Sequence, residues 1–273
     1  MKTPQRKLHK TKGILRPRKS LGQHFLNDPN LAKRIVKASG EISNSNIIEI
    51  GPGPGILTRA LLEAGAKKVI VIEIDERFLD NLNNIELSYP GRLRIISDDA
   101  RRLNLGNICS PPKKIVANLP YNIGTALLVS WLKSARKFER FTLMFQKEVA
   151  KRLVAKPKTK NYGRLSILTQ WLCEVNYEFD VPKNLFYPPP KVDSAVVSII
   201  PREKPLISIK MESLESVTSA AFGQRRKMLR SSLKGLSLDP ESCGISEKRR
   251  AEELSVIEFC ALAALLETSN SFC

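Results

Sequence analysis

The residues most able to do chemistry form the tetrapeptide Asn118-Leu119-Pro120-Tyr121, which follows an apolar run at 115–117. The Asn118 side-chain oxygen and the Leu119 carbonyl are acceptors that can hold the two hydrogens of one amino group. Pro120 biases Leu119 to an extended conformation and so fixes the direction of that carbonyl. Tyr121 offers a face on which a planar base can stack. The tetrapeptide therefore suits the capture of an amino group on a base such as adenine.

Methylation of an adenine amino group sets particular demands. The nitrogen lone pair is delocalised into the ring, and two acceptors favour a pyramidal nitrogen whose lone pair points at a methyl donor. No strong base is needed, because the amine becomes acidic once it is methylated. Positioning and charge matching in a dry pocket would provide the catalysis. The alternative for the same residues is a turn that merely ends a strand, since asparagine and proline both favour turns.

A glycine-rich turn, EIGPGPG, precedes a helical pattern that begins at Ile56. Its glycines allow a tight turn and a close approach of the backbone to a ligand. The spacing does not match the dinucleotide fingerprint G-x-G-x-x-G, because Ile56 stands where the third glycine is needed. Gly51 and Gly53 are therefore expected to lie against a ligand other than NAD, or simply to make the turn.

Two acidic positions extend this pattern. Glu73 lies 20 residues after Gly53 and ends the next predicted strand, where a carboxylate can accept hydrogen bonds from both ribose hydroxyls of an adenosine. Asp98 and Asp99 end the third strand, and one of them can accept from an adenine amino group. Taken singly, these residues could be a solvated strand end and a helix cap. Because parallel α/β sheets bind ligands at the carboxyl ends of their strands, together they predict an adenosine-containing cofactor.

Short apolar runs alternate regularly with amphipathic stretches, which predicts a doubly wound, mostly parallel α/β sheet. The stretches 175–181 and 191–201 have no helix between them and predict an antiparallel pair at the sheet edge. The parallel strands are predicted at 46–51, 67–75, 92–99, 113–119 and 140–146, with helical patterns at 56–66 and 76–87.

The last part of the chain changes in character. Strand patterns are nearly absent after about residue 205, and 212–235 and 247–268 have helical patterns, the second of which follows a serine start. The predicted division is a basic, flexible tail at 1–20, a cofactor-binding domain at 21–204 and a small all-helical domain at 205–273.

The charge of the chain points to a polyanionic partner. Its 273 residues contain 45 Lys and Arg against 27 Asp and Glu, a formal net charge of +18, which favours nucleic acid or an anionic membrane surface. No run of about 18 apolar residues is present, so no membrane span is expected. The five cysteines are scattered and only two histidines accompany them, so neither a metal site nor a disulfide framework is predicted, and reduced thiols favour a cytoplasmic location.

Seven ordered motifs from about Ser20 to the C-terminus resemble those of the ribosomal RNA adenine N6-dimethyltransferases. These S-adenosylmethionine-dependent enzymes modify two adjacent adenosines near the end of the small-subunit RNA. The resemblance implies a Rossmann-like class I methyltransferase sheet and a role in small-subunit maturation. The motifs are LGQHFLND, EIGPGPGILT, VIEID, DDA, NLPYNI, LFYPPPKVDSAV and AFGQRRKMLRSSL.

The resemblance also implies roles for individual residues. His24 and Leu26 would touch the methionine end of the cofactor, Gly51 would lie against it, Glu73 would hold its ribose, and Asp99 its adenine. Asn118 would face both the cofactor and the target amine. Phe186 would form the second wall of a base clamp opposite Tyr121; the alternative for Phe186 is a core aromatic ahead of a polyproline turn.

A basic segment in the last motif is the candidate RNA-binding surface. Because these residues are spread around a predicted helix, some are expected to meet RNA phosphates while others form ion pairs. The alternative is a solvated face. The candidates are Arg225, Arg226, Lys227, Arg230 and Lys234.

The predicted activity is methyl transfer from S-adenosylmethionine to small-subunit (16S) rRNA, by a monomer that acts on a pre-ribosomal particle. Two alternatives remain. One is a resistance-type enzyme that methylates large-subunit (23S) rRNA, and the other is a non-catalytic RNA-binding or assembly factor on the same fold. The AFGQRRKMLR motif and the long helical tail favour the first hypothesis.

Overall fold

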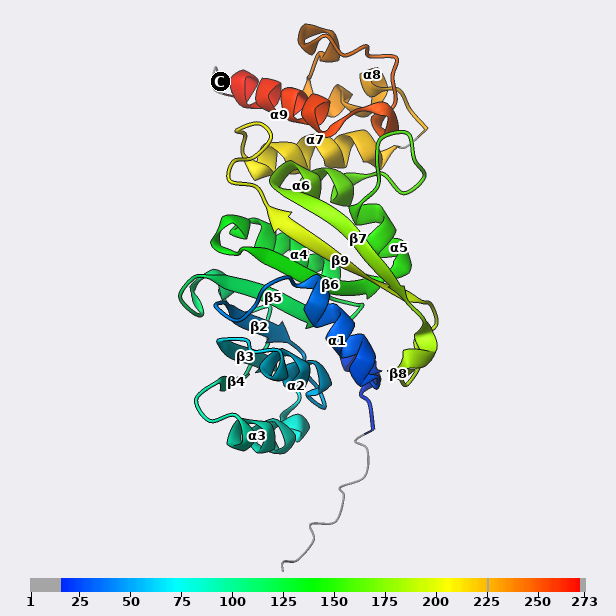
Figure 1. Cartoon of the computed structure of the whole chain (residues 1–273). Coiled ribbons are helices and arrows are strands. Elements are labelled where there is room, and N and C mark those ends of the chain that lie inside the picture. The colour runs from blue at the N-terminus through cyan, green and yellow to red at the C-terminus, as the bar shows by residue number, and fades with distance from the viewer. Residues whose placement is uncertain (1–15, 225, 271–273) are drawn as a thin grey trace, which may run out of the picture.

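The computed structural model describes residues 16–224 and 226–270 (Figure 1). Its centre is a seven-stranded sheet with the order β4-β3-β2-β5-β6-β9-β7. The first five strands in this order are parallel, whereas β9 pairs antiparallel with both β6 and β7. The predicted mixed sheet with an antiparallel edge pair is therefore confirmed. The strands are β2 (Asn46–Ile50), β3 (Lys68–Glu73), β4 (Leu93–Ser97), β5 (Lys113–Asn118), β6 (Arg140–Gln146), β7 (Cys173–Val181) and β9 (Ser194–Pro201).

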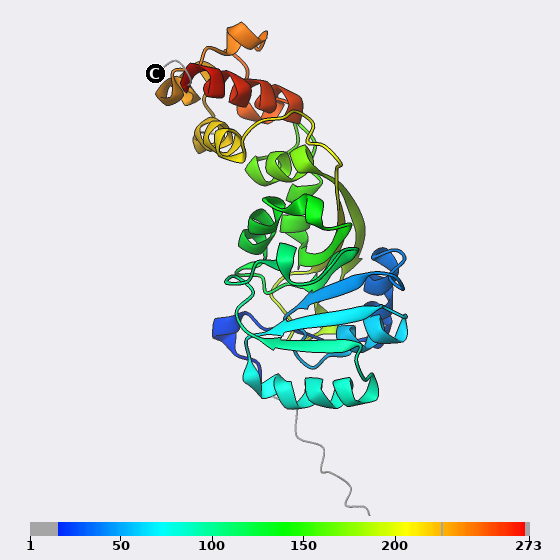
Figure 2. The same ribbon diagram turned by 90° about the vertical axis from the view of Figure 1, so that its left-hand side faces the viewer.

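Helices cover both faces of this sheet, which is why its inner strands consist almost entirely of buried residues, whereas many residues of the edge strands β4 and β7 are exposed or half-buried. One core layer joins the first three helices to side chains such as Ile47 and Val69, and the other joins α4, α5 and α6 to Ile48 and Ile115. Figure 2 shows α1 and α2 on the opposite side of the strands from α4. The helices are α1 (Pro29–Ala38), α2 (Ile56–Glu63), α3 (Leu79–Ser88), α4 (Gly124–Leu132), α5 (Lys147–Leu153) and α6 (Arg164–Leu172).

A second, two-stranded sheet was not predicted from the sequence. It pairs β1 (Phe25–Leu26) antiparallel with β8 (Phe186–Tyr187). Each strand has only two residues, too few to show a period. This ribbon fastens the segment before α1 to the loop between β7 and β9, and so brings two distant motifs together.

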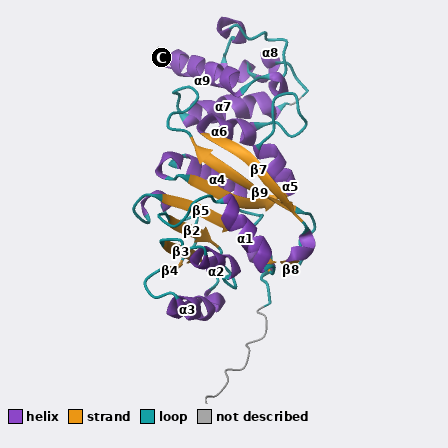
Figure 3. Ribbon diagram, in the orientation of Figure 1, coloured by secondary structure: helices purple, strands orange, loops and turns teal. Residues whose placement is uncertain are grey.

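The C-terminal part contains α7 (Met211–Gly223), the short α8 (Leu229–Ser232) and α9 (Val256–Asn270). Figure 3 shows helices and loops there without strands. The single helix predicted over 212–235 is wrong, because α7 ends at Gly223 and the chain turns before α8.

The helix predicted over 247–268 is also too long at its start. The capping serine is Ser255 rather than Ser246, because the Glu258 backbone N–H donates to Ser255 Oγ (3.2 Å) and Glu258 Oε2 accepts from the Ser255 N–H (2.7 Å). One continuous apolar cluster runs from the sheet through α6 to α7 and α9. Within the described ranges no helix is both long and apolar enough to cross a membrane.

Candidate active site

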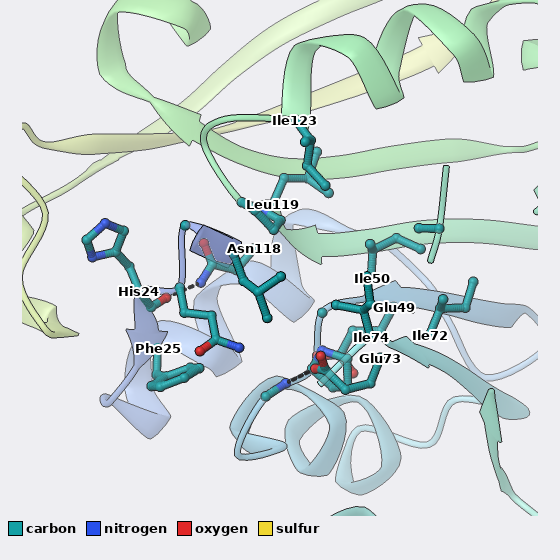
Figure 4. Close-up of a pocket in the computed structure, with 18 of the residues that line it drawn as sticks. His24, Phe25, Glu49, Ile50, Ile72, Glu73, Ile74, Asn118, Leu119 and Ile123 are labelled. Carbon is teal, nitrogen blue, oxygen red and sulfur yellow. Dashed lines mark hydrogen bonds between the residues drawn. The ribbon is translucent and has the colours of Figure 1, made fainter. Parts of the chain in front are cut away.

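A pocket opens where the parallel strands end, between the segment 20–26, the glycine-rich turn and the tetrapeptide after β5 (Figure 4). Ten of the eleven residues predicted for cofactor or acceptor binding line it; only Phe186 does not. Those that line it are His24, Leu26, Gly51, Gly53, Glu73, Asp99, Asn118, Leu119, Pro120 and Tyr121.

Glu73 lies at the end of β3 and is only 3% exposed. Its carboxylate accepts hydrogen bonds from the backbone N–H groups of Gly53 (3.0 Å) and Asp75 (2.8 Å). Burial raises the pKa of Glu73, and these two backbone donors partly offset that effect. The carboxylate is therefore held at the pocket wall by backbone alone, in a position that suits the two hydroxyls of a ribose.

The backbone of the glycine-rich turn is open at Gly51 and closely packed against a neighbouring side chain at Gly53. Gly51 has φ +65°, and a Cβ there would meet no atom within 4 Å, so a ligand can approach this backbone closely. Gly53 has φ +50°, and a Cβ there would lie 3.0 Å from the Phe25 ring. A side chain at either position would be strained, and at Gly53 it would also push the wall formed by β1 outward.

Glu49 lines the same pocket and had no role in the sequence-based prediction. It is 2% exposed, and burial raises its pKa to about 8, with the negative charge of Glu73 contributing. Thr58 Oγ1 donates a 2.6 Å hydrogen bond to its carboxyl group. The signal in the sequence was an acid flanked by isoleucines in the strand NIIEI.

Asp98 and Asp99 both line the pocket after β4. Arg101 Nη2 pairs with Asp99 Oδ2 at 2.6 Å, and this hydrogen-bonded partner lowers the pKa of Asp99. The Asp98 side chain accepts a hydrogen bond from the Asp99 backbone N–H (2.6 Å). Asp99 is thus a fixed, ionised acceptor at the pocket edge.

The tetrapeptide after β5 is held in one arrangement. Asn118 Nδ2 donates to the His24 carbonyl (3.0 Å), which leaves the side-chain oxygen of Asn118 as the free end of the amide. The Pro120 carbonyl accepts from the N–H of Gly124 (2.9 Å) and so anchors the turn to the start of α4. The orientation of the Asn118 amide therefore agrees with its predicted use as an acceptor.

The ring of His24 lies on the tetrapeptide side of the pocket. It stacks on Tyr121 with 5.4 Å between ring centroids and 29° between planes. Its Nδ1 lies 2.8 Å from the Pro188 carbonyl, which can only accept, so Nδ1 carries the hydrogen. Figure 4 shows the ring directed away from Glu73. The Tyr121 hydroxyl in turn shares a hydrogen bond with Ser194 Oγ at the start of β9.

Phe186 is placed differently from the other predicted residues. It is 4% exposed, pairs with Leu26 in the two-stranded sheet and does not line the pocket. Its neighbour Tyr187 is 46% exposed. The second wall of a base clamp at Phe186 therefore stays a prediction.

The described members of the predicted RNA-binding set lie between α7 and the chain just after α8, in the helical C-terminal part rather than at the strand ends (Figure 1). Arg225 lies outside the described residues. Arg226 and Lys227 are exposed, as is Lys234 in the 3-10 turn Lys234–Leu236, whereas the guanidinium of Arg230 lies 3.8 Å from a Glu247 carboxylate oxygen. Nowhere in the described parts of the chain do three or more metal-ligating side chains gather.

Comparison with known proteins identifies the family to which this site belongs. The model of the family described as "Ribosomal RNA adenine dimethylase" matches residues 14–268. The chain belongs to the ribosomal RNA adenine dimethylase family. It is 56% identical over 253 residues to "Ribosomal RNA small subunit methyltransferase A" of Paramagnetospirillum magneticum, covering 92% of this chain and 90% of that protein.

Solved structures show the same architecture. A dimethyladenosine transferase from Plasmodium falciparum superposes with a TM-score of 0.76 at 28% identity, covering 91% of this chain and 98% of that one. The 23S rRNA methyltransferase ErmE gives a TM-score of 0.66 at 27% identity, covering 89% and 99%. Membership of the dimethylase family makes the chain an S-adenosylmethionine-dependent rRNA adenine methyltransferase. The predicted family, fold class, enzymatic activity and cofactor are thereby confirmed.

Proposed function

We propose that this chain transfers methyl groups from S-adenosylmethionine to the N6 amino groups of two adjacent adenosines in a hairpin near the 3′ end of 16S rRNA. This activity would serve small-subunit maturation, with a pre-ribosomal particle as partner, a monomeric enzyme and a cytoplasmic location. The observation that carries the proposal is the Asn118 amide, whose nitrogen is held by the His24 carbonyl while its oxygen remains available as an acceptor.

The residues of the pocket fit the cofactor. Gly51 has open space beside its backbone, and the buried Glu73 offers a carboxylate suited to ribose hydroxyls. Asp99 would accept from the adenine amino group, Gly53 would keep the turn closed against Phe25, and Leu26 and the backbone of His24 would face the methionine end. When bound, S-adenosylmethionine supplies an electrophilic methyl group. The protein contributes binding, orientation and the exclusion of water.

The acceptor side would position the target amine. The Asn118 oxygen and the Leu119 carbonyl would accept its two hydrogens, and Pro120 fixes the second of these acceptors. Tyr121, held by Ser194 and His24, would stack on the base, with Phe186 opposite. The base must leave its helical stack to reach this crevice, at a cost of a few kcal/mol, which favours a loop over a duplex.

The basic residues after α7 would bind the RNA. Arg226 and Lys227 are exposed and make no ion pair within the described chain, which supports contact with phosphates. Arg225, Arg230 and Lys234 belong to the same proposal. We also propose the division into a tail at 1–20, a methyltransferase domain at 21–204 and an RNA-binding domain at 205–273.

Labelled S-adenosylmethionine incubated with immature small and large ribosomal subunits would test the substrate. We expect label in two adjacent adenosines of small-subunit RNA; label only in large-subunit RNA would refute the proposal and favour the activity of the ErmE type.

The variant Asn118→Ala separates catalysis from a pure binding role. We expect it to lower methyl transfer by about 100-fold or more, the order of magnitude found when one positioned hydrogen-bonding group is lost from a transition state, while RNA binding is retained. RNA modification at the wild-type rate in this variant would contradict the catalytic role of Asn118.

A further inference from the structure

Three segments that are far apart in the sequence meet at one corner of the molecule. They are the loop 154–163 between α5 and α6, residues 226–228 after α7, and the segment 248–252 before α9. The Lys158 backbone N–H donates to the Glu252 carbonyl (2.7 Å), and Met228 forms an antiparallel bridge with Arg250. The Tyr162 ring also packs edge-on against Phe222 of α7 (6.3 Å between centroids). These contacts join the loop of the methyltransferase part to the C-terminal helices.

The three segments carry exposed positive charges, several of which make no ion pair in the described parts of the chain. Two neighbouring arginines show the contrast: Arg249 pairs with Glu258, and Arg230 lies 3.8 Å from Glu247. In the described parts of the chain none of six exposed cations at this corner makes an ion pair. These six, the corner cations, are Lys156, Lys158, Arg226, Lys227, Lys248 and Arg250.

The position of the corner relates it to the active site. α5 begins directly after the carboxyl end of β6, the same edge of the sheet at which the pocket opens, and it leads into the loop 154–163. In Figure 1 the green loop and the orange segments lie together at the upper right, above the strand ends. A polyanion bound across the corner can therefore extend along this edge toward the pocket.

We propose that the corner cations form one phosphate-binding surface for the RNA substrate, in which the loop 154–163 contributes as much as the basic motif after α7. Six like charges held together on a fixed backbone repel each other, and a nucleic-acid backbone relieves this repulsion and releases its counterions. Lys158 and Lys156 thus bind the RNA from the methyltransferase part, while Arg226 and Lys227 bind it from the helical part. The surface rests on the proposed function, since it takes the same RNA.

The test is the salt dependence of binding to a hairpin RNA that carries two adjacent adenosines in its loop. Each lost phosphate contact lowers the slope of log K against log salt concentration by about 0.7–0.9. We expect the double variant K156A/K158A to lower the slope by about 1.4–1.8 and to leave S-adenosylmethionine affinity unchanged. The matched control K67A/K133A removes two exposed cations from the opposite edge of the sheet and should leave the slope as in the wild type.

If the slope of log K against log salt concentration is unchanged in K156A/K158A, or falls equally in the control, the proposed phosphate-binding surface is refuted. This failure is distinct from failure of the proposed function, because the wild-type protein would still methylate the small-subunit RNA. Thermal unfolding of each variant controls for loss of the fold. The backbone bond between Lys158 and Glu252 needs no lysine side chain, so we expect the loop to stay docked.

Discussion

Replacement of His24 tests whether its side chain serves the target base rather than the cofactor. The ring contacts Tyr121 and the Pro188 carbonyl, both on the acceptor side, and only the backbone carbonyl of His24 holds Asn118. The variant His24→Phe keeps an aromatic ring without the donor. The variant His24→Asn keeps a donor without the ring. Both leave the backbone carbonyl in place, so the hold on Asn118 should survive.

The size of the effect follows from the two contacts. A neutral hydrogen bond contributes about 1 kcal/mol net, and a ring stack contributes about 0.5–1.5 kcal/mol beyond its buried area. Loss of both in His24→Ala should cost about 1.5–2.5 kcal/mol, which corresponds to roughly a 10- to 70-fold fall in kcat/KM for RNA. His24→Phe and His24→Asn should each recover part of this loss, because each retains one contact.

The assay is steady-state methyl transfer to immature small subunits, combined with direct measurement of S-adenosylmethionine binding. We expect a raised KM for RNA, a lowered kcat and a cofactor affinity within about twofold of wild type, a change of no more than roughly 0.4 kcal/mol. If cofactor affinity in His24→Ala fell tenfold while the KM for RNA stayed constant, the ring would belong to the cofactor side and the reasoning would be wrong.

Two further predictions concern carboxyl groups near the pocket. The Arg77 hydrogen bonds lower the pKa of Asp75 from 3.8 to about 2, so Asp75→Asn should lower the free energy of unfolding by about 2 kcal/mol at pH 7. That contribution is present above pH 3.8 and is lost as the pH falls toward 2, so urea unfolding at neutral pH and at pH 2–3 checks it; an equal loss at both would contradict it. Burial raises the pKa of Glu49 to about 8, so the wild type should lose stability relative to Glu49→Gln as the pH rises from 5 to 8. If the free energies of unfolding of the two proteins changed in parallel between pH 5 and pH 8, the raised pKa of Glu49 would be contradicted.

The parallel strands and their ligand-binding ends could be predicted because each signal is local. A run such as KKVIVIEID indicates both a strand and the acid at its end. The order of the strands in the sheet then places Glu73 beside the glycine turn. The tetrapeptide at 118–121 was predictable in the same way, since proline acts on the residue directly before it.

The remaining features depend on contacts between distant segments. The pairing of Phe25 with Tyr187 leaves no trace in two-residue strands, and the stack of His24 on Tyr121 depends on that pairing. The helix predicted from Ser246 failed because a second serine, Ser255, has its glutamate partner three residues on, and the chain before it forms a turn, a bridge at Arg250 and the 3-10 turn Ala251–Glu253 instead of an α-helix. Glu49 was visible as an acid inside an apolar strand, but its raised pKa follows only from its burial beside Glu73.

The two-stranded ribbon also bears on how the protein is made. One wall of the pocket, at Phe25 and Leu26, pairs with residues 186–187, and Tyr121 is fixed by a serine at 194. Because a chain folds from its N-terminus as it leaves the ribosome, the five parallel strands can form before either partner has been synthesised. The glycine turn, Glu73 and Asp99 would then be in place first, whereas the wall at Phe25 and Leu26 and the fixed ring of Tyr121 would follow only after about residue 194 has emerged. Nascent chains stalled before and after that point should therefore differ in their capacity to hold an RNA base, although both contain every residue of the tetrapeptide.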